Sequence, residues 1–437
     1  MKLTTPVSGF SKFSKMEKIK FLSENLLNQK DAELIESFWH SNNQIQKTID
    51  EFSENTITNF PLPFGVVPNV IINNELFCVP MVIEESSVVA ACANSAKFWS
   101  TRGGFKTTII GTQKVGHVHL KTKIDKNELK QFFQDQKELI YNSLTSLTEN
   151  MDKRGGGLRS IELIDRTADL ENYFQLEVRV ETCDAMGANF INSILEQTGK
   201  YFGELLTKSS LKNKETYEVI MAILSNYTPD CLVRSEVTCS LDELNDPSLG
   251  MSGRQFAEKF KAAVDIARVD TSRATTHNKG IFNGVDAVIL ATGNDFRAVE
   301  ACGHTYACRD GKYRGLSYCK IEDDRFHFWI DLPLAVGTVG GLTKLHPLSR
   351  LALDILGRPN ASKLMEIIVT TGLAQNFGAL RSLVTTGIQK GHMKMHLMNI
   401  LNQLNATEEE VELSKGFFSD KTVSFRDVRD YLIGLRR

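Results

Sequence analysis

The sequence predicts an α+β protein in which a large, mainly helical part is interrupted by a small unit of strands and helices. Between residues 108 and 226 the hydrophobic pattern runs strand–helix–strand–strand–helix–strand, the order of an antiparallel split βαβ domain. The flanking segments, 1–107 and 227–386, read as one larger helical part. Residues 387–437 read as a polar helical tail. We therefore expect the small unit to be an insertion in the larger one.

The segments before the insertion have clear local patterns. Residues 14–50 carry leucines and isoleucines among charged and amide residues, which predicts helix. Residues 54–83 are rich in β-branched side chains and are interrupted by proline and glycine, which predicts short strands and turns. From Ser86 the small residues of SSVVAACANSAKFW predict a helix that packs closely in a core.

The insertion contains most of the predicted strands. Residues 107–120 (TTIIGTQKVGHVHL) alternate as in one strand, and KNELKQFFQDQKELIYNSLTSL predicts a polar helix before the RGGG of residues 154–157. IELIDRT and YFQLEVRVET predict two further strands. DAMGAN opens a long helix, and residues 217–226 predict the last strand.

The composition excludes several classes of protein. The 437 residues include 51 basic and 53 acidic side chains, and the net charge of −2 does not draw the chain to nucleic acid or to an anionic membrane. Eight cysteines without a CxxC pair fit a reducing compartment. The polar N-terminus lacks the apolar core of a signal peptide, and no apolar run reaches membrane-spanning length. We expect a cytoplasmic protein.

The first segment with candidate chemistry is VIEESSVVAA, where Glu84 and Glu85 lie between an apolar strand and a small-residue helix. A carboxyl group at such a boundary suits proton donation, because partial burial favours its neutral form. The alternative is an acidic residue at a helix start, where the helix dipole stabilises it.

The second segment is TSRATTHNKGIFNG, with Arg273 and Lys279 among small and polar residues, including His277, Asn278 and Asn283. This mixture predicts a loop that binds carboxylate and carbonyl oxygens, with arginine as the bidentate partner and lysine as the point charge. A solvated turn is the alternative.

The third segment, DAVILATGNDFRAVEA, predicts a short apolar strand at 287–291, a turn and then a helix. Asp295 lies at the predicted end of the strand, where α/β proteins often carry working residues. The same position suits a helix N-cap without further function. The residues alone leave both interpretations open.

Two clusters have residue types that bind metals. His392 and His396 are one helical turn apart, but HExxH is absent and the sequence offers no clear third ligand. Cys302, His304 and Cys308 lack a second ligand pair, and we interpret them as core residues. We expect no metal, and we interpret His392 as a titrating group on a mobile C-terminal helix.

Four glycine-containing segments, RGGG, DAMGAN, MSGR and GTVGG, allow close approach of the backbone to a ligand or to another element. None of them is a GxGxxG after a strand, so a Rossmann domain is not indicated. DAMGAN begins a helix, and the free N–H groups there are suited to a phosphate or pyrophosphate.

Taken together and in this order, the segments resemble one family. ENTITNFPLPFGVVPNVIINNELFCVPMVIEESSVVAA is similar to the substrate-binding opening of 3-hydroxy-3-methylglutaryl-CoA reductases, and DAMGAN is similar to their cofactor motif. HNKGIFNG followed by LATGND resembles the bacterial, soluble (class II) branch, and VGTVGG followed by GHM completes the set. The resemblance runs from about residue 50 to the end.

The resemblance implies roles for the residues that match the motifs. Glu85 would be the catalytic acid, Lys279 would stabilise the oxyanion, and Asp295 would couple to both. His392 would protonate the departing CoA thiolate. Substrate would be held by Ser87, Arg273 and Asn283, and the cofactor by Asp184, Met186, Gly187, Asn189 and Asn226.

These implied roles suit the reduction of a thioester to an alcohol, which takes two hydride additions. Each addition builds negative charge on a carbonyl oxygen, which a lysine ammonium stabilises. A CoA thiolate, whose pKa is about 8.5, can take a proton from a histidine with a pKa of about 6.5.

Two features depart from the family pattern. Relatives that prefer NAD carry an acidic residue in the helix before the glycines, where it would repel a 2′-phosphate, and this position here is Thr148. NADPH is therefore slightly preferred over NADH. His117 and His119 also differ from the usual sequence of the family at these positions, and we interpret them as residues of a packed or solvated strand face.

The resemblance implies a large substrate domain (1–107 and 227–386), an inserted ferredoxin-like cofactor domain (108–226) and a C-terminal flap (387–437). It also implies a homodimer with active sites at the subunit boundary, with further assembly and the physiological direction left open. The expected ligands are 3-hydroxy-3-methylglutaryl-CoA, mevalonate and CoA. The alternatives are a hydroxyacyl-CoA dehydrogenase, which predicts a Rossmann fingerprint, and an inactive acyl-CoA-binding protein, which predicts a broken set of catalytic residues.

Overall fold

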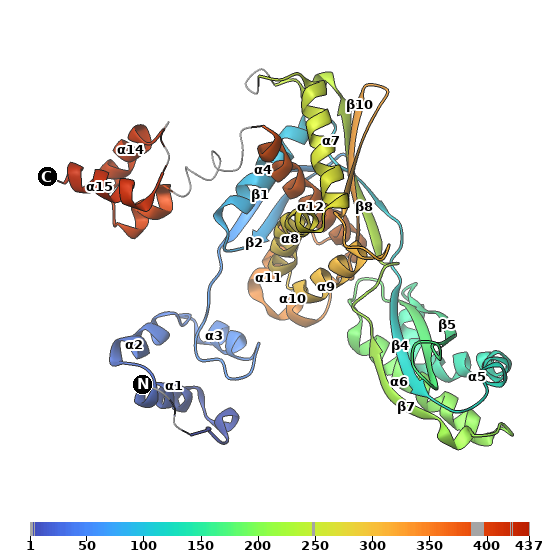
Figure 1. The fold of residues 1–437 in the computed structure, drawn as a ribbon. Coiled ribbons are helices and arrows are strands. Elements are labelled where there is room, and N and C mark those ends of the chain that lie inside the picture. The colour runs from blue at the N-terminus through green and yellow to red at the C-terminus, as the bar shows by residue number, and fades with distance from the viewer. Residues whose placement is uncertain are drawn as a thin grey trace.

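The computed structural model describes residues 3, 5–246, 250–385, 397–419, 421 and 423–436. Figure 1 shows a large central body, a smaller body of sheet and helices beside it, and short helices near both ends of the chain that stand away from the central body. Helices and antiparallel sheets are both present, which confirms the predicted α+β class. Within the described ranges, none of the helices combines the length and apolar character needed to cross a membrane.

The N-terminal helical region consists of short helices. Ser14 and Asn28 begin two of them, because each side chain accepts a backbone N–H in a capping box. Lys15 and Asp50 connect the first helix to the last through an ion pair of 2.8 Å. The elements are η1 (Phe10–Lys12), α1 (Lys15–Asn25), α2 (Gln29–Ser37) and α3 (Asn43–Asp50).

The large body is built around α12 (Ala361–Val384), a helix buried on nearly all sides. The hairpin of β1 (Phe64–Ile72) and β2 (Glu75–Val82) carries α4 (Ser86–Ser100), which packs against α12. A four-stranded antiparallel sheet in the order β3–β8–β10–β9 also packs against α12. Its strands are β3 (Lys106–Ile109), β8 (Leu232–Ser240), β10 (Arg325–Pro333) and β9 (Ser317–Glu322).

The other helices of this body surround the same core. The longest, α8, contacts α12 along much of its length, and α7 and α9 pack against α8. Their bounds are α7 (Gly253–Val269), α8 (Thr271–Ala291), α9 (Phe296–Ala307), α10 (Gly341–Leu345) and α11 (Pro347–Ile355), with η3 (Asp242–Leu244) before α7.

The small body has the predicted order of elements. Its antiparallel sheet runs β5–β6–β4–β7, with α5 and α6 packed against it, which is the ferredoxin-like arrangement. The elements are β4 (Lys114–Lys121), α5 (Lys126–Asp152), β5 (Gly157–Asp165), β6 (Tyr173–Glu181), α6 (Ala188–Lys208), η2 (Lys214–Thr216) and β7 (Glu218–Leu224). The domain bounds given from the sequence remain a prediction.

One predicted strand was wrong. Residues 107–120 form two strands in different sheets, because β3 pairs with β8 of the large body and β4 pairs with β6 and β7 of the small one. The chain crosses between the bodies at Gly111, whose N–H donates to the carbonyl of Leu232 at 3.1 Å. The N–H of Leu232 donates back to Gly111 at 2.9 Å, so the outgoing and returning segments are paired.

The described residues of the C-terminal tail are mainly helical, as predicted. Residues 397–403 form one helix, followed by α14 (Glu408–Phe417) and α15 (Phe425–Leu435). These helices share a small core with Leu401 and Val428 at its centre. His392 and His396 lie outside the described residues.

Candidate active site

Glu85 begins α4, where its backbone is extended and its side chain makes no cap to the helix. The carboxylate accepts a hydrogen bond from the Ser87 hydroxyl at 3.1 Å. Its other oxygen lies 3.2 Å from the Lys279 ammonium. The start of α4 therefore turns Glu85 toward α8, and the carboxylate is not used for helix capping.

Lys279 lies in the middle of α8, so the predicted loop at this segment was wrong. Residues of low helix propensity fill the segment, yet it is helical from Thr271 to Ala291. Helical spacing places Asn283 on the same face as Lys279, one turn further along. The predicted strand at 287–291 was also wrong, because these residues are the last turn of α8.

Arg273 lies in the first turn of α8 and is half-buried. Burial lowers the pKa of its guanidinium, since the charged form is less well solvated there. Asp270, the N-cap, accepts the backbone N–H of Arg273 at 2.6 Å. The arrangement leaves the guanidinium as a partly desolvated cation at the start of the helix.

Asp295 is the N-cap of α9, as one of the two sequence interpretations predicted. Its carboxylate accepts backbone N–H groups from Arg297 at 3.0 Å and Ala298 at 3.2 Å, and it pairs with the Arg297 guanidinium at 3.0 Å. Asn294, its neighbour, accepts the N–H of Gly337 at 2.8 Å. The coupling of Asp295 to Glu85 and Lys279 remains a prediction.

The DAMGAN segment forms a tight turn between β6 and α6. Gly187 is the N-cap of α6 with φ +86°, and a Cβ there would lie 2.5 Å from Cγ2 of Thr182. Only glycine therefore fits this position without strain. Asn189 follows in the exposed first turn of α6.

Asp184 joins this turn to the large body. Its carboxylate accepts the backbone N–H of Ala361, the first residue of α12, at 2.8 Å. Its backbone carbonyl accepts the N–H of Thr338 at 2.9 Å. A Cβ on Gly337 would lie 2.5 Å from the backbone nitrogen of Met186, so the segment around Gly337 lies in close contact with the DAMGAN turn.

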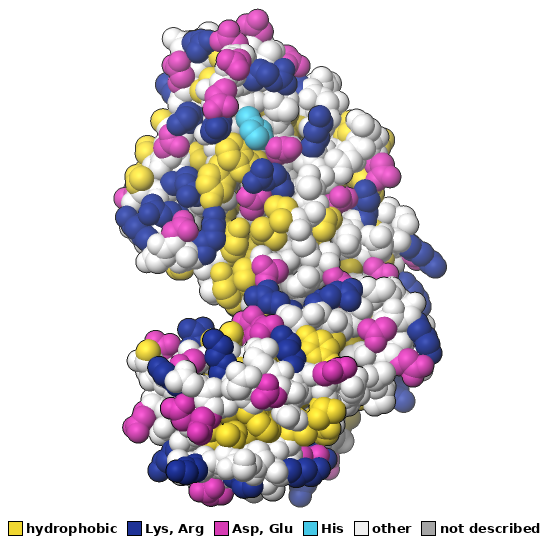
Figure 2. Space-filling view, turned by 90° about the vertical axis from the view of Figure 1, so that its right-hand side faces the viewer, with side chains coloured by type: hydrophobic (Ala, Val, Ile, Leu, Met, Phe, Trp, Pro, Cys, Tyr) yellow, Lys and Arg dark blue, Asp and Glu magenta, His cyan; other side chains and the backbone are white. Residues whose placement is uncertain are grey.

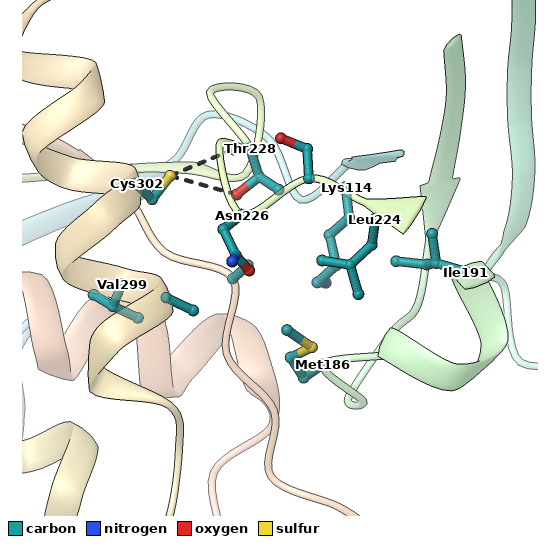
Figure 3. A pocket seen from close by; sticks show the side chains of 11 residues that line it. Lys114, Met186, Ile191, Leu224, Asn226, Thr228, Val299 and Cys302 are labelled. Carbon is teal, nitrogen blue, oxygen red and sulfur yellow. Dashed lines mark hydrogen bonds between the residues drawn. The ribbon is translucent and has the colours of Figure 1, made fainter. Parts of the chain in front are cut away.

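A small cavity of about 10 Å³ lies between the two bodies, beside the turn. Figure 3 shows Val299 and Cys302 on one side, from α9, and Ile191 of α6 on the other, with Met186 and Asn226 between them. Two predicted cofactor residues, Met186 and Asn226, thus line a cavity that begins one turn into the helix capped by Asp295.

Known proteins of similar sequence and structure identify the family. The family model described as hydroxymethylglutaryl-coenzyme A reductase matches residues 14–397. The chain belongs to the hydroxymethylglutaryl-coenzyme A reductase family.

Individual reductases agree with this membership. The 3-hydroxy-3-methylglutaryl-coenzyme A reductase of Archaeoglobus fulgidus is 33% identical over 412 residues, which cover 94% of this chain and 90% of the relative. A probable reductase of Borreliella burgdorferi is also 33% identical, over 91% of this chain and 89% of its own length. The class II reductase of Streptococcus pneumoniae, in a structure bound to NADPH in open conformations, has a TM-score of 0.72 at 35% identity and covers 97% of this chain and 100% of its own.

Within this reductase fold the predicted residues separate into two groups. Glu85, Ser87 and Lys279 meet directly through two side-chain contacts, while Met186 and Asn226 line the cavity between the bodies. The Asp184 carboxylate accepts the N–H of Ala361 in α12, and its predicted place at the cofactor site remains a prediction. Thr148 is 5% exposed in α5, so its proposed place beside a ribose remains a prediction.

The sequence interpretation missed Lys114, which lines the cavity beside Met186. The sequence pattern could have indicated this lysine. Gly116, Val118 and Leu120 occupy alternate positions of β4 and face α6 and the core. Lys114 belongs to the same alternate set, so it is a lysine on the inward side of a strand. Asn294 was also missed, although it stands next to Asp295.

Two further polar groups of the reductase, His277 and Asp286, have pKa values shifted by burial. His277 donates to or accepts from Ser317 at 2.6 Å, and burial lowers its pKa to about 3. Burial, together with the neighbouring Glu300 carboxylate, raises the pKa of Asp286 to about 8. Across the described part of the chain, no group of three or more His, Cys, Asp or Glu side chains could hold a metal ion.

Proposed function

We propose that the chain reduces 3-hydroxy-3-methylglutaryl-CoA to mevalonate and CoA, using two hydrides from NADPH or NADH. The carrying observation is the contact of 3.2 Å between Glu85 and Lys279, which are 194 residues apart in a chain of this family. A carboxyl group that gives a proton and an ammonium that stabilises an oxyanion are the two groups that carbonyl reduction requires.

Lys279 is the proposed oxyanion-stabilising group. Its side chain is 64% exposed and reaches out from a helix that is otherwise well packed, so a bound carbonyl can approach it. Glu85, on the other side of the contact, is the proposed proton donor to the same oxygen. The nicotinamide, when bound, supplies the hydride to the carbonyl carbon.

Asp295 and His392 have proposed roles around this pair. Asp295 would couple electrostatically to Glu85 and Lys279, from a position fixed by its capping of α9. His392 would protonate the CoA thiolate as it leaves, because a titrating imidazole suits this step near neutral pH. Ser87, Arg273 and Asn283 would hold the acyl part and carboxylate of the substrate.

A groove of about 610 Å³ between α4 and α12 is the proposed site for the CoA portion. Ala91, Asn94 and Phe98 line it, and they continue along α4 on the helical face that begins at Ser87. Lys97 and Arg381 also line it, Arg381 being paired with Asp246 at 3.1 Å, so Lys97 is the proposed source of positive charge. A groove that begins one helical turn beyond Ser87 and carries a lysine suits a long ligand with phosphates.

The cofactor is proposed to bind at the start of α6. Residues of the predicted set fit a dinucleotide there: Gly187 allows close approach of the backbone, and the free N–H groups of the first turn face a phosphate group. Met186, Asn189 and Asn226 complete this set, and Asp184 would act through the position of the turn. NADPH is the proposed preferred cofactor, in keeping with the absence of an acidic residue at Thr148.

A homodimer is proposed, with α10 and α11 at its interface. Their exposed leucines border the turn before Asp295, because a Cβ on Gly293 would lie 3.2 Å from the carbonyl carbon of Leu342. An apolar surface of this kind marks an interaction site. The exposed side chains are Val339, Leu342, Leu345, Leu348, Leu351 and Ile355.

We also propose a cytoplasmic location for the protein. The proposed domains are residues 1–107 together with 227–386, residues 108–226, and residues 387–437.

The test is the oxidation of the reduced nicotinamide by purified protein with 3-hydroxy-3-methylglutaryl-CoA, using NADPH and NADH in turn. Two cofactor molecules should be oxidised per thioester consumed, with mevalonate as the product. Oxidation of the reduced cofactor with a 3-ketoacyl-CoA, one molecule per substrate, and not with 3-hydroxy-3-methylglutaryl-CoA would instead support a hydroxyacyl-CoA dehydrogenase. Binding of the thioester without oxidation of either cofactor would support an inactive acyl-CoA-binding protein.

A further inference from the structure

Lys114 is a buried lysine at the junction of the two bodies. It is the first residue of β4 and is only 4% exposed. It lines the small cavity beside Met186 and also a neighbouring cavity of about 310 Å³. Figure 2 shows a notch between the upper, large body and the lower, small body, with both basic and acidic side chains around it.

Within the described part of the chain, no hydrogen bond or ion pair joins the Lys114 ammonium to another residue, and the nitrogen is not itself completely buried. The carboxylates of the neighbouring cavity are engaged elsewhere. Glu181 accepts from the backbone N–H of Cys183 at 3.0 Å and from the Thr112 hydroxyl, and Asp184 accepts from Ala361. The Lys114 side chain is 4% exposed and makes no ion pair with the Glu181 and Asp184 carboxylates that line the same cavity, so an anion bound there would be its first direct partner.

The surroundings of Lys114 indicate which anion. Figure 3 shows Lys114 on the small-body side of the cavity, with Leu224, Ile191 and Met186. Met186 and Ile191 flank the start of α6, where the free backbone N–H groups also favour negative charge. Two independent sources of positive potential thus meet at one place.

We propose that Lys114 is a cofactor-binding residue whose ammonium pairs with the pyrophosphate of the nicotinamide dinucleotide at the start of α6. The proposal rests on the proposed function, since it assumes that a dinucleotide binds beside the DAMGAN turn. The pyrophosphate is the group that NADPH and NADH share, and a single lysine serves it as a point charge.

The substrate carboxylate is a less suitable partner for Lys114. The lining of its cavity comes from α6, α9 and the segments that join the two bodies, and it does not include Glu85, Ser87 or Lys279. Arg273 and Lys279 supply cations at the Glu85 end of the site. Lys114 therefore supplies charge to the other end, where no cation was assigned from the sequence.

The experiment measures dissociation constants of the full-length protein for NADPH and NADH by titration calorimetry. Lys114→Met keeps most of the length of the side chain and removes its charge, and Lys121→Met removes an exposed lysine at the far end of the same strand. Lys114→Met should weaken the binding of both cofactors by about tenfold to a hundredfold, the range for loss of a charged hydrogen bond. Lys121→Met should bind as the wild type does.

Thermal unfolding of the cofactor-free proteins separates binding from structure. Lys114→Met should unfold at the same or a higher temperature than the wild type, because it removes an unpaired buried charge. A lower unfolding temperature together with unchanged affinity would overturn the proposal, since it would show a structural role. Lys114→Gln is the second variant, and its affinity decides the matter if the methionine variant does not fold.

Three results would count against the assignment. Unchanged affinity of the variants for both dinucleotides would remove Lys114 from the cofactor site while leaving the proposed function intact. Loss of NADPH affinity alone would move the lysine to the 2′-phosphate and overturn the pyrophosphate pairing. Failure of the wild type to bind either dinucleotide would instead overturn the proposed function itself, and with it this proposal.

Discussion

The two ends of the candidate site are built in opposite ways. At the proposed substrate end, Lys279 is exposed and Glu85 is partly exposed, the two side chains contact each other, and they project from helices packed against α12. At the proposed cofactor end, the Lys114 side chain is 4% exposed and makes no ion pair, and the DAMGAN turn is fixed by contacts to the other body.

This difference separates reaction from recognition. Groups that exchange protons or stabilise a changing charge must meet a substrate that enters and leaves, so exposure on a rigid helix suits them. A group that recognises a constant charge can remain buried, because its partner is the same in every cycle. The expected effects of substitutions therefore differ in kind between Glu85–Lys279 and the region around Lys114 and Asp184.

The largest effect is expected for Lys279→Ala. Turnover should fall by about 10²–10³-fold, because no other cation is assigned to the oxyanion. The Michaelis constant for NADPH and the unfolding temperature should change little, since the side chain is exposed. Steady-state kinetics of this variant beside Lys259→Ala, an exposed lysine of α7, provide the measurement. Near-normal turnover would remove Lys279 from the reaction.

His392→Gln should impair the reduction of the thioester by about 10²-fold, the range for loss of a general acid. Free mevaldehyde has no thiolate to release, so its reduction should be affected much less. The two rates are compared at pH 7 with saturating cofactor. Equal losses would mean that His392 serves binding or closure, and its role in protonating the thiolate would be withdrawn.

Substitutions of Asp184 test whether this residue positions the DAMGAN turn for cofactor binding. Asp184→Ala removes the acceptor for the Ala361 N–H and should raise the Michaelis constant for NADPH by about tenfold with a smaller change in turnover. Asp184→Asn keeps an acceptor oxygen and should remain close to the wild type. Equal impairment of the two variants would show that the negative charge of Asp184 is required, and it would contradict the role of Asp184 in positioning the turn.

The smallest effect on turnover is expected for Asp286→Asn, whose effect is on stability. Burial raises the pKa of Asp286 to about 8, so the folded protein keeps a proton that the unfolded chain loses near pH 4. Stability of the wild type should therefore decrease as pH rises from about 4 to about 8.

Asp286→Asn removes this dependence and should be more stable than the wild type at pH 8 by about 1–2 kcal/mol. Urea unfolding at pH 5 and pH 8 measures the difference, with the exposed Asp310→Asn as the control. A difference that does not grow between the two values of pH would show that Asp286 ionises in the folded protein as it does in solution.

The sequence predicted the small body well, and the reason is physical. Its strand β6 has one face on the core and one face toward solvent, so apolar and polar residues alternate in YFQLEVRVE. The family motifs also identified Glu85 and Lys279, whose contact depends on tertiary structure that no local pattern contains.

The errors arose where tertiary packing overrides local preference. The α8 segment carries Gly280 and Gly284 with several threonines and asparagines, which favour turns. Gly284 is required by the fold, because a Cβ there would lie 2.5 Å from the carbonyl oxygen of Thr371 in α12. Close packing of two helices thus maintains a helix that its own residues do not favour. The hydrogen bond between Ala361 and Asp184 is also not visible in any local pattern, because the two residues are 177 positions apart.

The mutual hydrogen bonds of Gly111 and Leu232 have a consequence for engineering. Residues paired in this way have Cα atoms about 5.5 Å apart, a gap that a two-residue hairpin turn closes. The chain leaves the large body at Gly111 and returns to it at Leu232, and the 120 residues between these positions form the connected small body. Excision of that length and its replacement by Asn-Gly should leave a self-standing scaffold, on which a different module can be grafted in the same opening.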